Sequence, residues 1–140
     1  MTLIIRPPVP NDRAAWDRLY QGYSEFYKVT QTPAMRDTLW SWLMDVSTPV
    51  HGLVAQDDTG AFLGLAHFRP FARPLSASTG GFMDDLFVAP QGRGHSVADH
   101  LIQGVRDHGA AQGWSVIRWI TAEDNYRARA VYDRLADKTK

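Results

Sequence analysis

The segment 84–101 holds the residues that are best placed to do chemistry. An apolar run ends at Pro90, a turn with Gly92 and Gly94 follows, and an amphipathic pattern begins after the turn. Free backbone N–H groups at a helix start, together with the helix dipole, bind phosphate without side-chain specificity. Glycine lets the backbone approach a ligand closely, and Arg93 adds positive charge. On this basis alone, a phosphate site and an ordinary tight turn are equally good interpretations.

Further candidates flank this turn on both sides. Asp84 and Asp85 precede it within the apolar run, and a carboxylate is a candidate general base. Successive strand residues point to opposite faces, so we expect only one of the two to face a substrate. Asn125 and Tyr132 are seven residues apart, which places them on one face of a predicted helix.

The composition excludes several other kinds of site. The absence of cysteine removes disulfides, thiolate metal ligands and cysteine nucleophiles. The five histidines lack paired-ligand spacing, so we expect no metal site. Lysine plus arginine and aspartate plus glutamate each number 15, which weighs against a nucleic-acid partner. No apolar run approaches ~18 residues and the N-terminus does not resemble a signal peptide. We therefore expect a cytoplasmic protein with no membrane association.

The elements that position these residues follow from hydrophobic periodicity. Strands are predicted at 2–6, 51–56, 61–68, 82–88 and 116–121. Helices are predicted after Asn11 or Asp12, after Thr32-Pro33, from about Arg93 to Gly109 or Gly113, and from Asp124 or Asn125. A hairpin turn is expected at 57–60, and 68–81 is expected to be a loop. The order β-α-α-β-β-β-α-β-α predicts one α/β (α+β) domain over residues 1–140, with a mixed central sheet flanked by helices.

The run Leu86-Phe87-Val88-Ala89-Pro90-Gln91-Gly92-Arg93-Gly94 closely resembles the signature of the GNAT superfamily of N-acetyltransferases. The family pattern Arg/Gln-x-x-Gly-x-Gly/Ala corresponds here to residues 93–98, with Ser96 in place of the usual middle glycine. The resemblance implies the GNAT fold and acetyl-CoA as cofactor, with its diphosphate held by this turn. The implied cofactor-binding residues are Leu86, Phe87, Val88, Arg93, Gly94, His95, Ser96, Val97, Ala98, Asp99 and Asn125.

The predicted last helix also resembles the family, since Asn125, Ala128 and Tyr132 match its Asn-x-x-Ala-x-x-x-Tyr pattern. The resemblance implies that Tyr132 protonates the leaving sulfur and that the backbone N–H of Val88, or of a neighbour, polarises the acetyl carbonyl. The family's final strand has no counterpart after this helix. Because an exposed sheet edge favours association, we expect a homodimer.

The acceptor side is less defined. The segment Met83–Val88 resembles the corresponding strand of spermidine/spermine acetyltransferases, which implies that Asp84 is the base and acts through water. Alternatively, Asp84 only orients the acceptor ammonium and Asp85 stabilises a loop. Glu25 and Tyr27 resemble the acidic-aromatic acceptor wall of polyamine and amino-acid acetyltransferases, so we expect substrate contacts from Glu25, Tyr27 and Asp85.

The sequence leaves the acceptor open. Arg69 or Arg73 would suit an amine that carries a carboxylate, whereas Asp84 and Glu25 would suit a polyamine, and His67 and Arg69 are expected on the same side. We expect an acetyl-CoA-dependent N-acetyltransferase that modifies a primary amine of a small molecule by direct transfer in a ternary complex. The alternatives are a non-catalytic acyl-CoA-binding domain and, least favoured, an RNA- or ribosome-directed acetyltransferase.

Overall fold

The computed structural model describes residues 2–120 of the chain. The predicted order of helices and strands is confirmed as far as the fifth strand. The predicted last helix, with Asn125 and Tyr132, and the expected missing strand lie outside the described residues. In chain order the elements are β1 (Leu3–Arg6), η1 (Pro10–Asp12), α1 (Arg13–Phe26), α2 (Pro33–Leu43), β2 (His51–Asp57), β3 (Phe62–Arg73), β4 (Ser78–Val88), η2 (Pro90–Gly92), α3 (Val97–Gln112) and β5 (Ile117–Trp119).

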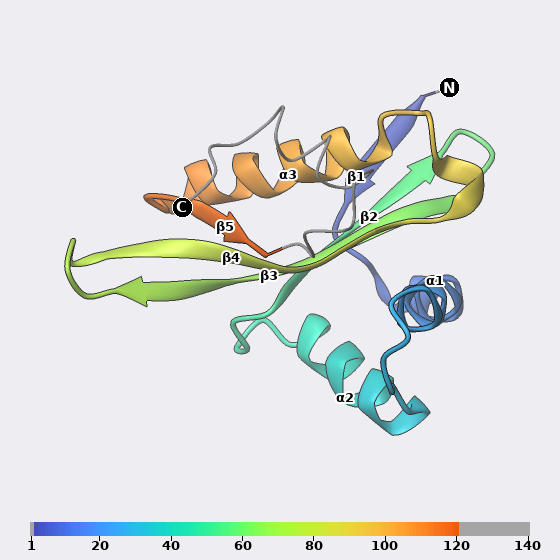
Figure 1. The fold of residues 1–140 in the computed structure, drawn as a ribbon, viewed down its shortest axis with the longest axis horizontal. Coiled ribbons are helices and arrows are strands. Elements are labelled where there is room, and N and C mark those ends of the chain that lie inside the picture. Colours follow the sequence, from blue (N-terminus) through green and yellow to red (C-terminus); the bar gives the residue numbers. More distant parts are fainter. Residues whose placement is uncertain (1, 121–140) are drawn as a thin grey trace.

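The five strands form one mixed sheet in the order β1-β2-β3-β4-β5. The first four strands pair antiparallel, and β5 pairs parallel with β4 after the α3 crossover. Helix α3 covers one face of the sheet, and α1 and α2 lie on the other (Figure 1). The predicted mixed sheet flanked by helices is therefore confirmed.

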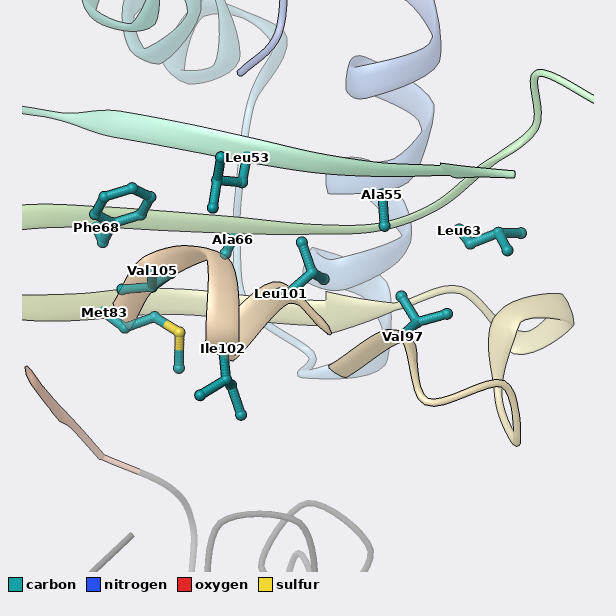
Figure 2. Packing of buried hydrophobic residues seen from close by; sticks show 10 residues of the cluster. All are labelled: Leu53, Ala55, Leu63, Ala66, Phe68, Met83, Val97, Leu101, Ile102 and Val105. Carbon is teal, nitrogen blue, oxygen red and sulfur yellow. The ribbon is translucent and has the colours of Figure 1, made fainter. Parts of the chain in front are cut away.

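Each face of the sheet has its own core. On the α3 face, Leu101, Ile102 and Val105 are at most 1% exposed and pack onto the sheet (Figure 2). All ten residues of that cluster are apolar. The core under α1 and α2 is built around Trp16 and Leu65, which are both fully buried, with the rings of Tyr20, Trp40 and Phe87 beside them.

Local sequence explains most element ends. Thr32 caps α2, because its Oγ1 accepts a hydrogen bond from the N–H of Met35 at 3.2 Å, and Pro33 occupies the first turn. The β2–β3 turn is closed by Asp57, whose Oδ1 accepts from the backbone N–H groups of Thr59 and Ala61. Gly60 provides the left-handed residue there, at φ +89°.

Three predicted elements differ from the structure. The segment 68–81 is largely strand, since β3 continues to Arg73 and pairs with the start of β4; cross-strand pairing overrides the turn-forming composition. Helix α3 begins at Val97 instead of near Arg93, because the turn before it contains left-handed residues. Strand β5 is half-buried with Arg118 exposed, and not largely buried as expected.

Candidate functional site

Of the two glycines expected to be left-handed in the turn between β4 and α3, Gly94 is, whereas Gly92 is buried in a 3-10 turn and is not. A short 3-10 turn, η2, leads to Gly94 at φ +84°, and Ser96 follows at φ +59°, ψ +26°. Left-handed backbone is costly for residues with a Cβ, so the position that Ser96 occupies is one that favours glycine. This explains why the family pattern has glycine at this position, and why serine there strains the backbone.

Helix α3 starts from this turn without a side-chain cap. Within residues 2–120, the side chain of Ser96 accepts no cap hydrogen bond from the helix. The N–H groups of Val97 and Ala98 come before the first intrahelical bond, in which the N–H of His100 donates to the carbonyl of Ser96. Such N–H groups, at the positive end of a helix dipole, form an anion-binding arrangement. The side chain of Val97 is 2% exposed in the core, so it can serve a ligand only through its backbone.

The other side chains of the turn have distinct environments. Gly94 and His95 are exposed, and the guanidinium of Arg93 lies over the ring of Phe26, 5.2 Å from its centroid. This contact joins the turn to the end of α1. On β4, Leu86 and Val88 pack against the α3-side core, whereas Phe87 packs under α1.

The last part of β4 presents backbone N–H groups at the sheet edge. The N–H of Ala89 donates to Leu63 on the β3 side at 2.9 Å, and strand N–H groups alternate between the two edges. The N–H of Val88 therefore points away from β3. On that side, the pairing of β4 with β5 ends at Met83 and Trp119 within residues 2–120. The expected carbonyl-polarising group thus lies where β4 has left β5.

A β-bulge sets the directions of Asp84 and Asp85. His67 pairs with Asp85 and Phe68 pairs with Met83, so Asp84 is the extra residue of β4. A bulge interrupts strand alternation, and both carboxylates contact residues of β3. We expected the two adjacent aspartates to point in opposite directions because residues alternate in a regular strand. The register shift at Asp84 means that this alternation does not apply here.

The two carboxylates nevertheless have different surroundings. Asp84 is exposed and forms a two-pronged ion pair with Arg69, with Nε–Oδ2 at 3.0 Å and Nη2–Oδ1 at 3.2 Å. Asp85 is 16% exposed and accepts hydrogen bonds at Oδ2 from Tyr20 Oη at 2.7 Å and His67 Nδ1 at 2.8 Å. Asp85 therefore stabilises the α1–β3 junction and not a loop.

The electrostatics keep Asp85 anionic. Burial alone would raise the pKa of Asp85, but hydrogen bonds from His67, Tyr20 and Tyr23 outweigh it and hold that pKa below the usual range. Burial, reinforced by the charge of Asp85, raises the pKa of both Tyr20 and Tyr23 well above the ordinary value. The two hydroxyls therefore stay protonated and donate. The indole N–H of Trp16 donates to the far side of His67, at 3.0 Å from Nε2.

Aromatic rings continue from this carboxylate along α1. Tyr23 contacts Tyr20 at a centroid distance of 5.4 Å and Tyr27 at 4.8 Å, and exposure rises from 7% at Tyr20 to 37% at Tyr27. The expected substrate residue Tyr27 therefore belongs to the same aromatic row as the Asp85 donors. The expected residue Glu25 is exposed at the end of α1.

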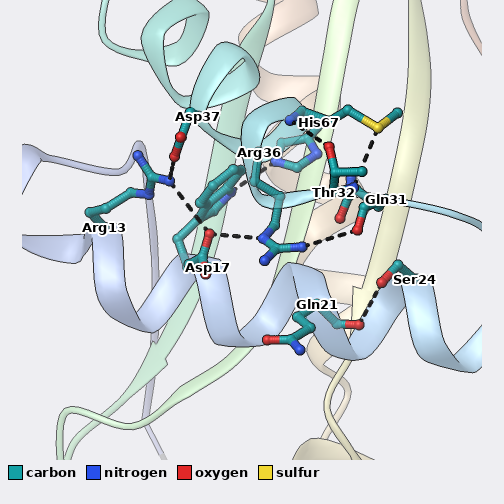
Figure 3. A network of polar contacts seen from close by, with 11 residues as sticks. Arg13, Asp17, Gln21, Ser24, Gln31, Thr32, Arg36, Asp37 and His67 are labelled. Carbon is teal, nitrogen blue, oxygen red and sulfur yellow. Dashed lines mark hydrogen bonds and ion pairs between the residues drawn. The ribbon is translucent and has the colours of Figure 1, made fainter.

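Ion pairs between side chains join helix α1 to helix α2 (Figure 3). Arg36 is buried and donates from Nε to Asp17 Oδ1 at 2.9 Å and from Nη1 to the carbonyl of Gln31 at 3.4 Å. Arg13 pairs with Asp37 across the two helices. The side chain of Gln31 in turn donates a hydrogen bond to Tyr20.

Sequence patterns placed some of these residues and missed others. Trp16 and Tyr20 were interpretable only as part of an apolar helix stripe, because their polar partners are 51 and 65 positions away. No local signal marks Gln31. Among residues 2–120, no group of three or more His, Asp or Glu side chains could hold a metal, and no helix is long and apolar enough to cross a membrane.

Comparisons with known proteins agree with this geometry. The model of the acetyltransferase (GNAT) family matches residues 16–136. D-amino-acid N-acetyltransferase HPA3 of Saccharomyces cerevisiae (strain ATCC 204508 / S288c) is 28% identical over 138 residues, with 98% of this chain and 86% of that protein covered.

Solved structures show the same fold at lower identity. Ribosomal-protein-alanine N-acetyltransferase from Brucella melitensis biovar Abortus 2308 superposes with a TM-score of 0.81 at 19% identity, covering 99% of this chain and 94% of that one. AAC(6')-Iy, in complex with the bisubstrate analogue CoA-S-monomethyl-acetylneamine, gives 0.83 at 20% identity, covering 100% and 94%. A structure described as a probable acetyltransferase gives 0.85 at 24% identity, covering 100% and 91%.

Proposed function

The chain belongs to the acetyltransferase (GNAT) family and is an N-acetyltransferase, and we propose that it moves the acetyl group of acetyl-CoA to the primary amine of a small, amino-acid-like molecule. The observation that carries the proposal is the turn from Val88 to Val97. It combines left-handed residues at Gly94 and Ser96 with a helix start that Ser96 does not cap, beside the part of β4 that extends past its pairing with β5 within residues 2–120.

The residues of this turn fit the diphosphate of CoA. The N–H groups at the start of α3 and the charge of Arg93 attract phosphate, and exposed Gly94 presents no side chain that blocks the backbone. Bound acetyl-CoA supplies an activated thioester. In the proposed site, the N–H of Val88 donates to its carbonyl oxygen, which gains negative charge as the amine attacks.

The proton balance requires two protein groups. The amine nitrogen forms a bond to the acetyl carbon and loses one proton, while the carbon–sulfur bond breaks and the sulfur gains one. We assign protonation of the leaving sulfur to Tyr132. This residue lies outside the described residues, as does Asn125, the proposed contact to pantetheine. The assignment rests on the sequence pattern of the last helix.

On the acceptor side we assign the main role to Asp85. Asp84, the sequence-based candidate for the base, has both oxygens engaged by Arg69. Asp85 is held as an anion by fixed donors and remains partly exposed. A carboxylate of this kind binds an ammonium group, which releases one proton to solvent to become the neutral amine. The carboxylate then takes the proton that the nitrogen loses on attack and returns it to solvent.

The amino-acid-like class is supported by two observations. Arg69 lies two residues beyond His67 on β3 and is paired with Asp84, so an acceptor carboxylate would bind Arg69 by replacing Asp84 in that ion pair. The relative HPA3 is named for D-amino acids. A polyamine offers no group that would use Arg69.

The test is an acceptor panel. Purified protein with acetyl-CoA is given D-amino acids, the matching L-amino acids, spermidine and an aminoglycoside, and N-acetyl product is identified by mass while released CoA is measured. We expect product with amino acids and a lower kcat/KM with spermidine. Tight acetyl-CoA binding without product from any amine would instead support the acyl-CoA-binding alternative.

We also propose that the protein forms a homodimer, as expected from its sequence. Light scattering checks it: a dimer has twice the 15.7 kDa mass of the chain.

A further inference from the structure

Asp85 lies at the end of a hydrogen-bonded chain that begins deep in the core. Trp16 is 0% exposed and His67 2%, whereas the Asp85 side chain is 16% exposed. The chain therefore runs from a closed interior to a carboxylate that a solute can reach. The proposed acetyl transfer uses Asp85 and leaves the two groups behind it unexplained.

The contacts fix the proton on His67. An indole N–H is only a donor, so Nε2 of His67, 3.0 Å from Trp16 Nε1, must accept. The ring proton is then on Nδ1, which donates to Asp85 Oδ2 at 2.8 Å. A second proton on Nε2 would point at the hydrogen of Trp16. These contacts assign His67 the tautomer that carries its proton on Nδ1.

The same contacts fix the carboxylate. Its Oδ2 accepts from both His67 and Tyr20, at 2.8 and 2.7 Å, and a proton on that oxygen would displace one donor. The rings also set its position, because Tyr20 meets His67 edge-on at 4.7 Å and Trp16 meets His67 at 5.9 Å between centroids.

We propose that Trp16 and His67 are positioning residues, in which Trp16 fixes the tautomer of His67 so that His67 holds Asp85 as an oriented anion for the acceptor amine. This inference rests on the proposed acetyltransferase function. The titratable and charged groups around Asp85 are His67 and Arg69 from β3, Tyr20 and Tyr23 from α1, and Asp84 beside it on β4.

The kinetic test compares His67→Phe with His67→Gln. In the first, Asp85 stays buried but loses a donor, so its pKa rises and protonation removes activity at acid pH. The ratio of the variant's kcat/KM for the amine to that of wild type cancels the amine's own ionisation. We expect this ratio to be constant at high pH and to fall by about tenfold for each pH unit below the raised pKa of Asp85, until the wild-type carboxyl is protonated as well. His67→Gln keeps an N–H donor and should restore much of the lost ratio.

A ratio that is the same at every pH would overturn the proposal, because a merely structural defect lowers activity without a new ionisation. Thermal melting shows whether each variant is folded. If His67→Phe does not fold, the same comparison is made with Trp16→Phe, and Trp40→Phe is its matched control. Trp40 packs on Trp16 at 5.0 Å, and no contact joins it to His67 in the described structure.

The second readout needs no acetyl transfer. Nitrogen NMR of the wild-type imidazoles at pH 8 should show His67 with its proton on Nδ1 and with Nε2 as an acceptor. Trp16→Phe should change the Nε2 signal of His67, and Trp40→Phe should not. An imidazolium or the Nε2–H tautomer in wild type at pH 7 would refute the positioning chain. A correct tautomer in a protein that acetylates no amine would refute the proposed function alone.

Discussion

The two faces of the sheet are packed from different kinds of residue. Under α3 the cluster is wholly apolar, from Leu53 through Val105. Under α1 and α2, buried rings surround a hydrogen-bonded histidine and aspartate. Burying polar groups costs free energy unless every partner is present, so a core of the second kind is harder to build.

This difference indicates that the two faces of the sheet have different roles, one in cofactor binding and the other in binding the acceptor amine. The apolar face needs only to hold α3 rigid, because a phosphate site at a helix start uses backbone N–H groups. The polar face must hold one carboxylate at a defined place and charge. Substitutions on the α3 face are therefore expected to change stability and cofactor binding. Substitutions on the α1–α2 face are expected to change the kinetic constants for the amine.

The largest expected effect comes from the adjacent aspartates. Asp85→Asn should lower kcat/KM for the amine by about 100-fold or more, the range of general-base and anchoring carboxylates. Asp84→Asn removes an exposed ion pair, which contributes about 1 kcal/mol or less, and should change it only a few-fold. Steady-state kinetics at pH 8 measures both. A larger loss of kcat/KM in Asp84→Asn than in Asp85→Asn would support Asp84 as the base, as the sequence led us to expect.

Two buried leucines on opposite faces give the next comparison. Leu101 on the α3 side and Leu65 on the α1–α2 side are both 0% exposed. Each substitution by alanine should reduce the free energy of unfolding by about 2–5 kcal/mol through lost burial and a cavity. Denaturant titration measures that loss. Only Leu65→Ala should also raise the KM for the amine. If both variants changed the KM values for the amine and for acetyl-CoA equally, the proposed division between the two faces would be contradicted.

The sequence predicted the α3 side of the site better than the acceptor side. Proline, glycine and periodicity act locally, and they located the strand and the turn around Gly94, although the helix begins at Val97 and not near Arg93. The bulge at Asp84 is a register shift between β3 and β4, and no residue type near it signals the shift. Likewise, the Trp16–His67 bond joins residues 51 positions apart, so it exists only once α1 has packed on the sheet.

A smaller effect is expected at the serine of the cofactor turn. Ser96 has φ +59°, where a Cβ costs about 1 kcal/mol. Ser96→Gly should therefore raise the free energy of unfolding by up to that amount and tighten acetyl-CoA binding a few-fold. Thermal melts with and without acetyl-CoA measure both. Weaker cofactor binding in Ser96→Gly would mean that the serine hydroxyl contributes a contact.

The smallest effect concerns two histidines at the far end of α3. Burial lowers the pKa of His51 and of His108, with the charge of His108 adding to the shift at His51, and their rings lie 4.6 Å apart. Because the folded pKa values are below those of the unfolded chain, their contribution to stability is present above about pH 6.5 and is lost as pH falls. Melting temperatures from pH 8 to pH 5 should decline, and His108→Phe should flatten that decline. An equal slope in the variant would contradict this origin.

The division between the two faces is tested most directly by the acetyl-CoA dissociation constant of Asp85→Asn, measured by calorimetry on the variant that has lost amine turnover. We predict a value within about twofold of wild type, because the cofactor contacts lie at the start of α3. A dissociation constant weakened tenfold or more, equivalent to about 1.4 kcal/mol, would show that Asp85 supports cofactor binding and would contradict its assignment to the acceptor amine.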